Sequence, residues 1–205
     1  MTRPRTPGNQ ESTIWNSMGR ISYSMIVSLD GFIEGPSGSI GFSEPSEDLH
    51  RYANDTARGT GVYLLGRGLY EMMEPYWPDV AAKQPGPDYV DEFARIWVDT
   101  PRIVFSNSLG AVGPGCELRK EIDPDEIRKL KAETDGTVSV GGASLASDFA
   151  ALGLIDEVEL LVQPVIVGGG KPMFGNGFDG LELKPSGTRT FDSGALVLSY
   201  RMKAR

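Results

Sequence analysis

TVSVGGASLASDFAALG, residues 137–153, joins a short apolar segment to an amphipathic one through two adjacent glycines. The apolar segment predicts a strand that ends at Val140. The spacing of Leu145, Phe149 and Leu152 predicts a helix that buries these three side chains on one face. A buried strand that runs directly into a helix is the building unit of α/β proteins, so this stretch indicates the fold class.

Similar strand and helix signals recur along the rest of the chain. The predicted strands before and after this stretch are 20–28, 62–65, 102–105 and 158–162. The predicted helices begin near Ser46 and Gly66, and two more cover 87–98 and 124–133, the last capped by Asp123. The segments 181–191 and 195–202 flank Asp192-Ser193-Gly194, which predicts a closing antiparallel hairpin. The sequence therefore predicts an α/β fold with a mainly parallel, doubly wound central sheet and a C-terminal hairpin.

Length and composition favour a single domain. The chain has 205 residues, 40% of them hydrophobic, which is enough for one core. We expect a flexible leader at residues 1–17 and one domain over 18–205. No segment is long and apolar enough to span a bilayer or act as a secretory signal, which predicts a cytoplasmic protein without a membrane partner.

Charge and rare residues exclude several classes of function. The net charge of -8 disfavours binding to nucleic acid. The single cysteine, Cys116, cannot form an intramolecular disulfide. The single histidine, His50, argues against a zinc site or a hydrolytic triad, and we expect it to be an exposed helix residue. No metal site is predicted.

Three predicted strands end in residues that suit a phosphate group. These ends are Gly141-Gly142-Ala143-Ser144, Gly66-Arg67-Gly68 and Phe105-Ser106-Asn107-Ser108. Glycines let a phosphate approach backbone amides at a helix start, although they equally suit a tight turn. An arginine in a first helical turn favours a nearby anion, although it could simply face solvent. The third end lacks the acidic residue that binds an unmodified ribose, which favours NADP over NAD.

Together, the order and spacing of several motifs resemble those of the dihydrofolate reductase superfamily. The resemblance is strongest to the reductase domain of the bacterial riboflavin-biosynthesis deaminase-reductases and to its stand-alone relatives. It rests on SLDGFI at 28–33, LGR at 65–67, VFS at 104–106, GGAS at 141–144 and PVIVGGGKPMF at 164–174. The resemblance implies a dihydrofolate-reductase-like three-layer fold. No deaminase half is present, because the zinc ligands of a deaminase are lacking.

The resemblance also implies NADPH as the cofactor and assigns residues to it. The adenosine end would face Gly66, Arg67, Gly68, Ser106 and Asn107. The pyrophosphate would lie on Gly141, Gly142, Ala143, Ser144 and Leu145. Backbone near Ile26 and Ile33 would orient the nicotinamide.

For catalysis and the substrate, the same resemblance gives further candidates. Asp48 is the candidate catalytic carboxylate and Glu47 is its rival, although both could simply favour the start of a helix. The candidate substrate-binding residues are Asp30, Phe42, Arg51, Val167, Gly168 and Lys171, with Arg58 also near.

The implied function is an NADPH-dependent reductase similar to 5-amino-6-(5-phosphoribosylamino)uracil reductase. Hydride would pass to a small heterocyclic or sugar-derived substrate. One alternative is a dihydrofolate or pteridine reductase, and another is a nucleotide-binding or structural homodimer without turnover. A homodimer is expected, and Leu160 and Val162 would suit subunit pairing if they lay near a sheet edge, although core packing explains them equally.

Overall fold

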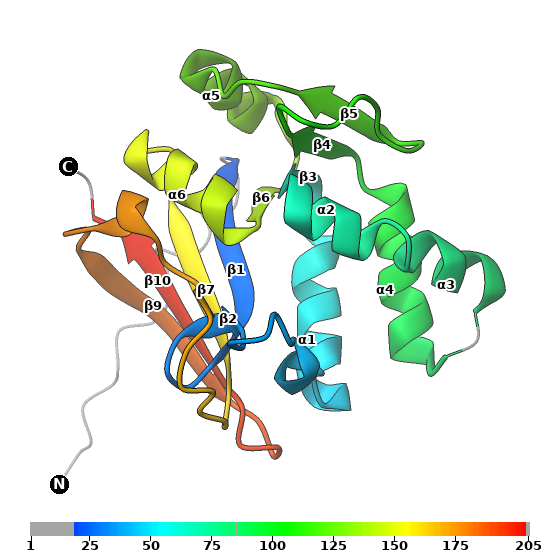
Figure 1. The fold of residues 1–205 in the computed structure, drawn as a ribbon, viewed down its shortest axis with the longest axis vertical. Helices are drawn as coiled ribbons and strands as arrows, with labels where there is room; N and C mark the ends of the chain where they lie inside the picture. Colours follow the sequence, from blue (N-terminus) through cyan, green and yellow to red (C-terminus); the bar gives the residue numbers. More distant parts are fainter. Residues whose placement is uncertain (1–18, 85, 204–205) are drawn as a thin grey trace, which may run out of the picture.

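The computed structural model describes residues 19–84 and 86–203 (Figure 1). The predicted leader at residues 1–17 lies outside these ranges. Within them, no helix combines the length and the apolar character needed to cross a membrane.

An eight-stranded sheet forms the centre of the molecule, with the strand order β5-β4-β3-β6-β1-β7-β10-β9. Its parallel strands are β1 (Arg20–Ser28), β3 (Thr60–Gly66), β4 (Arg102–Phe105), β5 (Cys116–Arg119), β6 (Thr137–Gly141) and β7 (Glu157–Gln163). The antiparallel pair is β9 (Leu183–Thr190) and β10 (Leu196–Met202). A separate two-stranded sheet joins β2 (Phe32–Glu34) to β8 (Lys171–Pro172). The predicted mainly parallel sheet and closing hairpin are thus confirmed.

Helices cover both faces of the sheet, which gives the three layers expected. The helices are α1 (Glu47–Arg58), α2 (Arg67–Met73), α3 (Trp77–Lys83), α4 (Asp88–Asp99), α5 (Pro124–Glu133) and α6 (Ala143–Ala151), with 3-10 turns η2 (Gly41–Ser43) and η3 (Asn176–Phe178). On one face, Phe149 of α6 and Ile127 of α5 belong to the same core as Tyr23 of β1. On the other face, Leu49 of α1 packs with Leu161 of β7.

Several expectations about single residues were wrong. Leu152 is 42% exposed, because α6 ends at Ala151 and Leu152 lies beyond its last residue, at the C-cap. His50 is half-buried among the rings of Trp77, Tyr89 and Phe93, which lie 5.0–6.5 Å from it, and burial lowers its pKa.

The expected sheet edge at Leu160 and Val162 was also wrong. Both lie on β7, which is hydrogen-bonded on its two sides to β1 and β10. The exposed edge near the C-terminus is β9 instead. These two residues therefore offer no edge for pairing with a second subunit.

Three short strands and one short α-helix were not predicted at all. They are β2, β5, β8 and α3. β5 reads CELR and α3 begins with Trp77-Pro78, so neither carries a clear apolar period.

Candidate cofactor and substrate site

The three strand ends with phosphate-binding character lie side by side. In the sheet register, Leu65 is the partner of Gly141, and Gly66 is the partner of Phe105. Because β3, β4 and β6 are parallel neighbours, their carboxyl ends meet at one edge of the sheet. Segments that are far apart in the sequence thus form one cluster of glycines, hydroxyl groups and an arginine.

Local geometry favours glycine at both positions after β6. Gly142 has φ 98°, a conformation that side chains rarely allow, and it is the N-cap residue of α6. A Cβ on Gly141 would lie 2.4 Å from Cδ2 of Leu69 on α2. Close packing of α2 on this turn therefore explains one glycine, and backbone conformation explains the other.

Helix α6 begins without any negative charge of its own. Its first turn contains no acidic residue, and Gly142 has no side chain to cap the helix. By contrast, α1, α4 and α5 each have two acidic residues in the first turn. The first amides of an α-helix have no acceptor within the helix, and together with the dipole they favour an anion. Ser144, which is exposed in this first turn, adds a hydroxyl group.

Arg67 lies at the start of α2 and reaches toward the end of β4. Its Nη1 donates to Oγ of Ser108 at 3.0 Å, and its Nε is 3.9 Å from a carboxylate oxygen of Glu71. The side chain remains 54% exposed. Ser106 is buried, and its Oγ accepts hydrogen bonds from the amides of Ser108 and Leu109.

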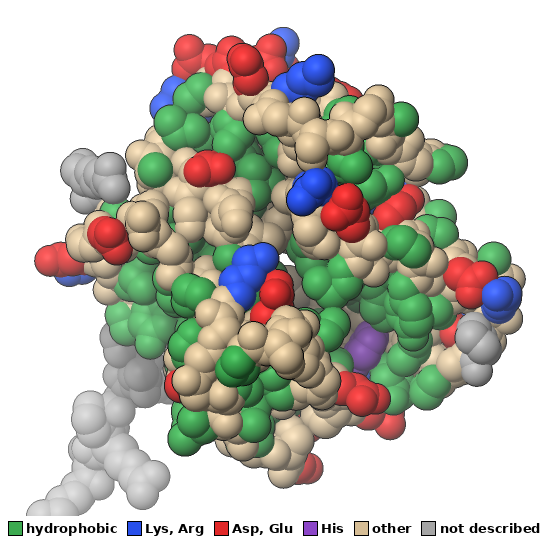
Figure 2. Space-filling view, in the orientation of Figure 1, with side chains coloured by type: hydrophobic (Ala, Val, Ile, Leu, Met, Phe, Trp, Pro, Cys, Tyr) green, Lys and Arg blue, Asp and Glu red, His purple; other side chains and the backbone are tan. Residues whose placement is uncertain are grey.

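Space is available beside this cluster. A Cβ built on Gly68 would meet no atom within 4 Å, and Asn107 is exposed. Figure 2 shows that this face of the molecule is hollowed near its middle, between the positions at which Figure 1 draws α2 and β2.

Asp30 ties together the two loops that follow β1 and β7. Its carboxylate accepts from the amides of Val167 at 3.2 Å and Gly168 at 2.8 Å. The hydroxyl of Ser28 and these amides lower the pKa of Asp30. The structure therefore brings three predicted substrate-binding residues together, with the Asp30 oxygens already occupied by backbone.

Lys171 and Glu34 join the same two loops on the β2–β8 pair. Nζ of Lys171 is 3.2 Å from Oε1 of Glu34. A Cβ on Gly170 would lie 1.9 Å from the carbonyl oxygen of Glu34, so this glycine allows the two loops to touch.

We expect Asp30→Ala to release the loop that contains Val167 and Gly168. Amide hydrogen exchange at these two positions should become markedly faster, because their acceptor is lost. In the wild type, the folded pKa of Asp30 lies below the unfolded value of about 3.9, so the stabilisation is present above that pH. It should disappear as the pH falls through the lower folded value. Asp30→Asn keeps one acceptor oxygen and should exchange at an intermediate rate; equal rates in all three proteins would contradict the prediction.

Asp48 lies at the start of α1 and is held by neighbours. The hydroxyl of Ser46 donates to it, as do the amides of Leu49 and Asp192, and these bonds lower its pKa. The carboxylate is therefore ionised at neutral pH and links α1 to the β9–β10 turn. Its rival Glu47 is 60% exposed and accepts from Arg51 at 2.9 Å.

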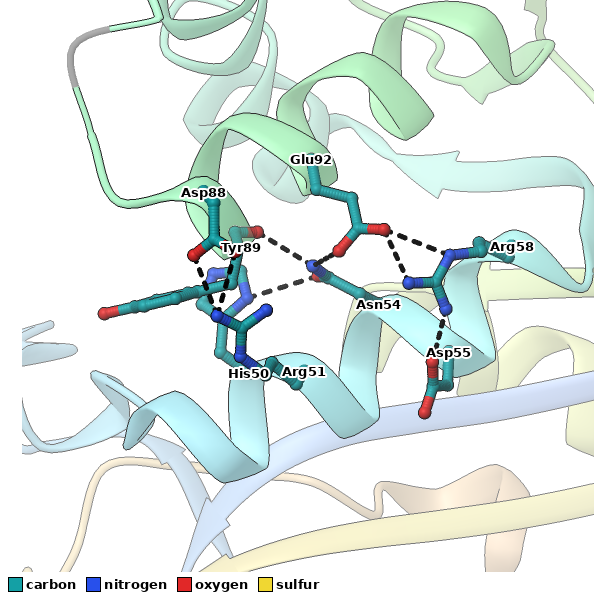
Figure 3. A network of polar contacts seen from close by, with 8 residues as sticks. All are labelled: His50, Arg51, Asn54, Asp55, Arg58, Asp88, Tyr89 and Glu92. Atoms are coloured by element: carbon teal, nitrogen blue, oxygen red, sulfur yellow. Dashed lines mark hydrogen bonds and ion pairs between the residues drawn. The ribbon is translucent and has the colours of Figure 1, made fainter.

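Arg51 and Arg58, the basic candidates on α1, face α4 (Figure 3). Arg51 donates to both carboxylate oxygens of Asp88, at 2.8 and 3.0 Å. Arg58 lies 2.5 Å from Glu92, which also accepts from Asn54. A substrate phosphate would have to displace these carboxylates, and within residues 19–84 and 86–203 neither arginine contacts Lys171.

The remaining candidates are apolar and lie at different depths. Ile26 is half-buried and packs on the α1 side of the sheet. Ile33 is buried in the core on the α6 side. Phe42 is half-buried within η2.

A search for sequence families adds an independent observation. Residues 20–197 match the family described as the RibD C-terminal domain. The chain belongs to the RibD C-terminal domain family. The predicted membership in the dihydrofolate-reductase-like reductase domains of riboflavin biosynthesis is thus confirmed.

Comparisons with individual proteins and solved structures add further similarities. The uncharacterized protein YyaP of Bacillus subtilis (strain 168) is 31% identical over 182 residues, which cover 88% of this chain and 94% of YyaP. The structure resembles the diaminohydroxyphosphoribosylaminopyrimidine deaminase/5-amino-6-(5-phosphoribosylamino)uracil reductase of Thermotoga maritima, with a TM-score of 0.61 and 15% identity over 94% of this chain and 59% of that chain. It also resembles dihydrofolate reductase from Enterococcus faecalis complexed with NADP(H), with a TM-score of 0.57 and 14% identity over 90% and 97% of the two chains. At these identities, the two solved structures show a shared fold.

One residue of the cluster was missed as a site candidate. Ser108 is the hydrogen-bond partner of Arg67, yet only Ser106 and Asn107 were assigned to the cofactor. The sequence could have indicated Ser108 as a site residue, since it belongs to the same polar turn after β4.

Proposed function

We propose that this member of the RibD C-terminal domain family is an NADPH-dependent reductase. The observation that carries the proposal is the start of α6, which lies beside the ends of β3 and β4 and has a glycine N-cap without a side-chain cap and no acidic residue in its first turn. This arrangement fits a pyrophosphate. When bound, NADPH would supply a hydride.

The chain's own residues would hold the cofactor in an extended position. Gly142 and Ser144 would contact the pyrophosphate through backbone and hydroxyl groups. Arg67, with Ser106 and Ser108 beside it, would bind the 2′-phosphate, because a guanidinium fork suits a phosphate better than a neutral ribose. Packing of α2 against the glycine turn would keep these groups preorganised.

The proposed substrate is a small heterocyclic or sugar-derived compound like that of 5-amino-6-(5-phosphoribosylamino)uracil reductase. Family membership supports this class. The ionised state of Asp48 argues against proton donation from that residue at neutral pH, so water or a substrate group would supply the proton. Phe42 and the loops joined by Asp30 would border the substrate.

An assay of NADPH oxidation tests the proposal directly. Loss of the reduced nicotinamide absorbance would be followed with 5-amino-6-(5-phosphoribosylamino)uracil and, separately, with dihydrofolate. Turnover of the aminouracil alone supports the proposed class, and turnover of dihydrofolate alone would replace it. If NADPH neither binds nor reacts, the chain is not an NADPH-dependent reductase.

Arg67→Ala should reduce the preference for NADPH over NADH about tenfold, because it removes a charged partner of the 2′-phosphate. The dissociation constants of both cofactors would be measured by quenching of protein fluorescence. Arg128→Ala is the matched control, since Arg128 is similarly exposed, at 58%, but lies on α5 and pairs with Asp125. An unchanged preference in Arg67→Ala would remove this arginine from the cofactor site.

A further inference from the structure

Gln163 carries an unexplained hydrogen-bond donor. Across residues 19–84 and 86–203, its Nε2 is the sole buried side-chain nitrogen or oxygen without a hydrogen-bond partner. The residue is 8% exposed. Buried polar groups in native proteins nearly always have partners, so the isolated amide indicates a missing hydrogen-bond acceptor.

Gln163 lies next to the start of the loop that contains Asp30. It is the last residue of β7, and its partner in the register is Ser28, the last residue of β1. Alternate residues of a strand share a face. Glu159 and Leu161, on the same face as Gln163, contact α1 through a 2.7 Å hydrogen bond from Tyr52 and through packing with Leu49. Gln163 therefore faces the N-terminal side of α1, at the carboxyl edge of the sheet.

Neighbouring polar groups at this edge are already satisfied within the chain. The Ser28 hydroxyl accepts from the amide of Phe32 at 3.0 Å. The Ser46 hydroxyl contacts Asp48 and Ser193. The acceptor that Gln163 lacks is therefore best supplied by a molecule from outside the chain.

We infer that Gln163 is a specificity-determining residue that donates a hydrogen bond to a ring carbonyl oxygen of the hydride acceptor. The inference rests on the proposed reductase function and narrows its substrates to heterocycles with such a carbonyl group. The amide nitrogen of a glutamine carries two N–H groups, and it can donate one of them to such an oxygen.

Isothermal titration of the NADPH-saturated protein with 5,6-diaminouracil tests the inference. The control ligand is 4,5-diaminopyrimidine, which has a related ring without the two carbonyl oxygens. Gln163→Leu removes the donor at similar volume, and Gln163→Glu replaces it with an acceptor. Both should weaken binding of 5,6-diaminouracil about tenfold and leave 4,5-diaminopyrimidine unchanged. The melting temperature of Gln163→Leu should stay the same or rise, because an unsatisfied buried group is removed.

Other outcomes separate this inference from the proposed function. Wild-type affinity for 5,6-diaminouracil in both variants would overturn the inference, and so would a lower melting temperature of Gln163→Leu with intact affinity. A wild type that is stabilised by NADPH but does not bind 5,6-diaminouracil would overturn the inference alone. A wild type that is not stabilised by NADPH would overturn the proposed function as well.

Discussion

Ser144→Asp should weaken NADPH binding about 100-fold or more while slightly raising the melting temperature. A carboxylate in the first turn of α6 would interact favourably with the helix dipole, by about 0.3–1 kcal/mol. The same charge would repel a pyrophosphate beside it, and two unit charges about 4 Å apart near a protein surface repel by roughly 4 kcal/mol. Fluorescence titration with NADPH and a thermal melt of the free protein measure the two effects.

Opposite changes in stability and binding make this substitution informative. Ser144→Asn is the matched control, because it has nearly the same shape without the charge, and its NADPH affinity should stay within about threefold of the wild type. If Ser144→Asp kept full NADPH affinity, no phosphate could lie at the start of α6, and the proposed cofactor site would be wrong.

Arg102→Ala should lower the free energy of unfolding by about 3–5 kcal/mol, because it leaves a carboxylate without its buried partner. Arg102 is 3% exposed, and its guanidinium donates to the carbonyl oxygens of Thr100 and Pro114, both at 3.0 Å. A carboxylate oxygen of Glu74 lies 3.4 Å from its Nε. Chemical denaturation at neutral pH measures the loss.

Two variants show whether fork geometry or charge matters at this position. Arg102→Lys keeps the charge but lacks the planar fork, so it should recover only part of the stability. Arg128→Ala, at an exposed position on α5, should change the free energy of unfolding by less than about 0.5 kcal/mol. A loss at Arg102→Ala no larger than that of Arg128→Ala would mean that the buried arginine contributes no net stability.

Much of the fold could be predicted because the deciding signals are local. The strand over 20–28 and the strand over 102–105 have their predicted bounds. Helix α5 begins directly after Asp123, whose side chain accepts a hydrogen bond from the amide of Asp125 at 2.8 Å. By contrast, β5 is an edge strand without a buried residue, and its four residues pair only because β4 lies beside it. Its existence depends on tertiary contacts that no local pattern contains.

The candidate site was harder to predict than the fold. Glycines and serines at strand ends could be recognised in the sequence, because the parallel topology brings such ends together. Hydrogen-bond partners that are distant in the sequence could not be recognised. Asp30 accepts a hydrogen bond from a loop more than a hundred positions away, and Arg51 donates to Asp88. Gln163 was not a candidate either, since an unsatisfied donor becomes visible only when its surroundings are known.

The place of β1 in the sheet has a consequence for biosynthesis. This first strand lies between β6 and β7, and Arg20 bonds to Glu157, 137 positions later. Until the ribosome has made β6 and β7, the apolar residues of β1 lack both of the strands that pair with them. Such non-local pairing makes folding slow and exposes nascent chains to aggregation. We therefore expect the polypeptide to depend on chaperones until β7 has left the ribosomal tunnel.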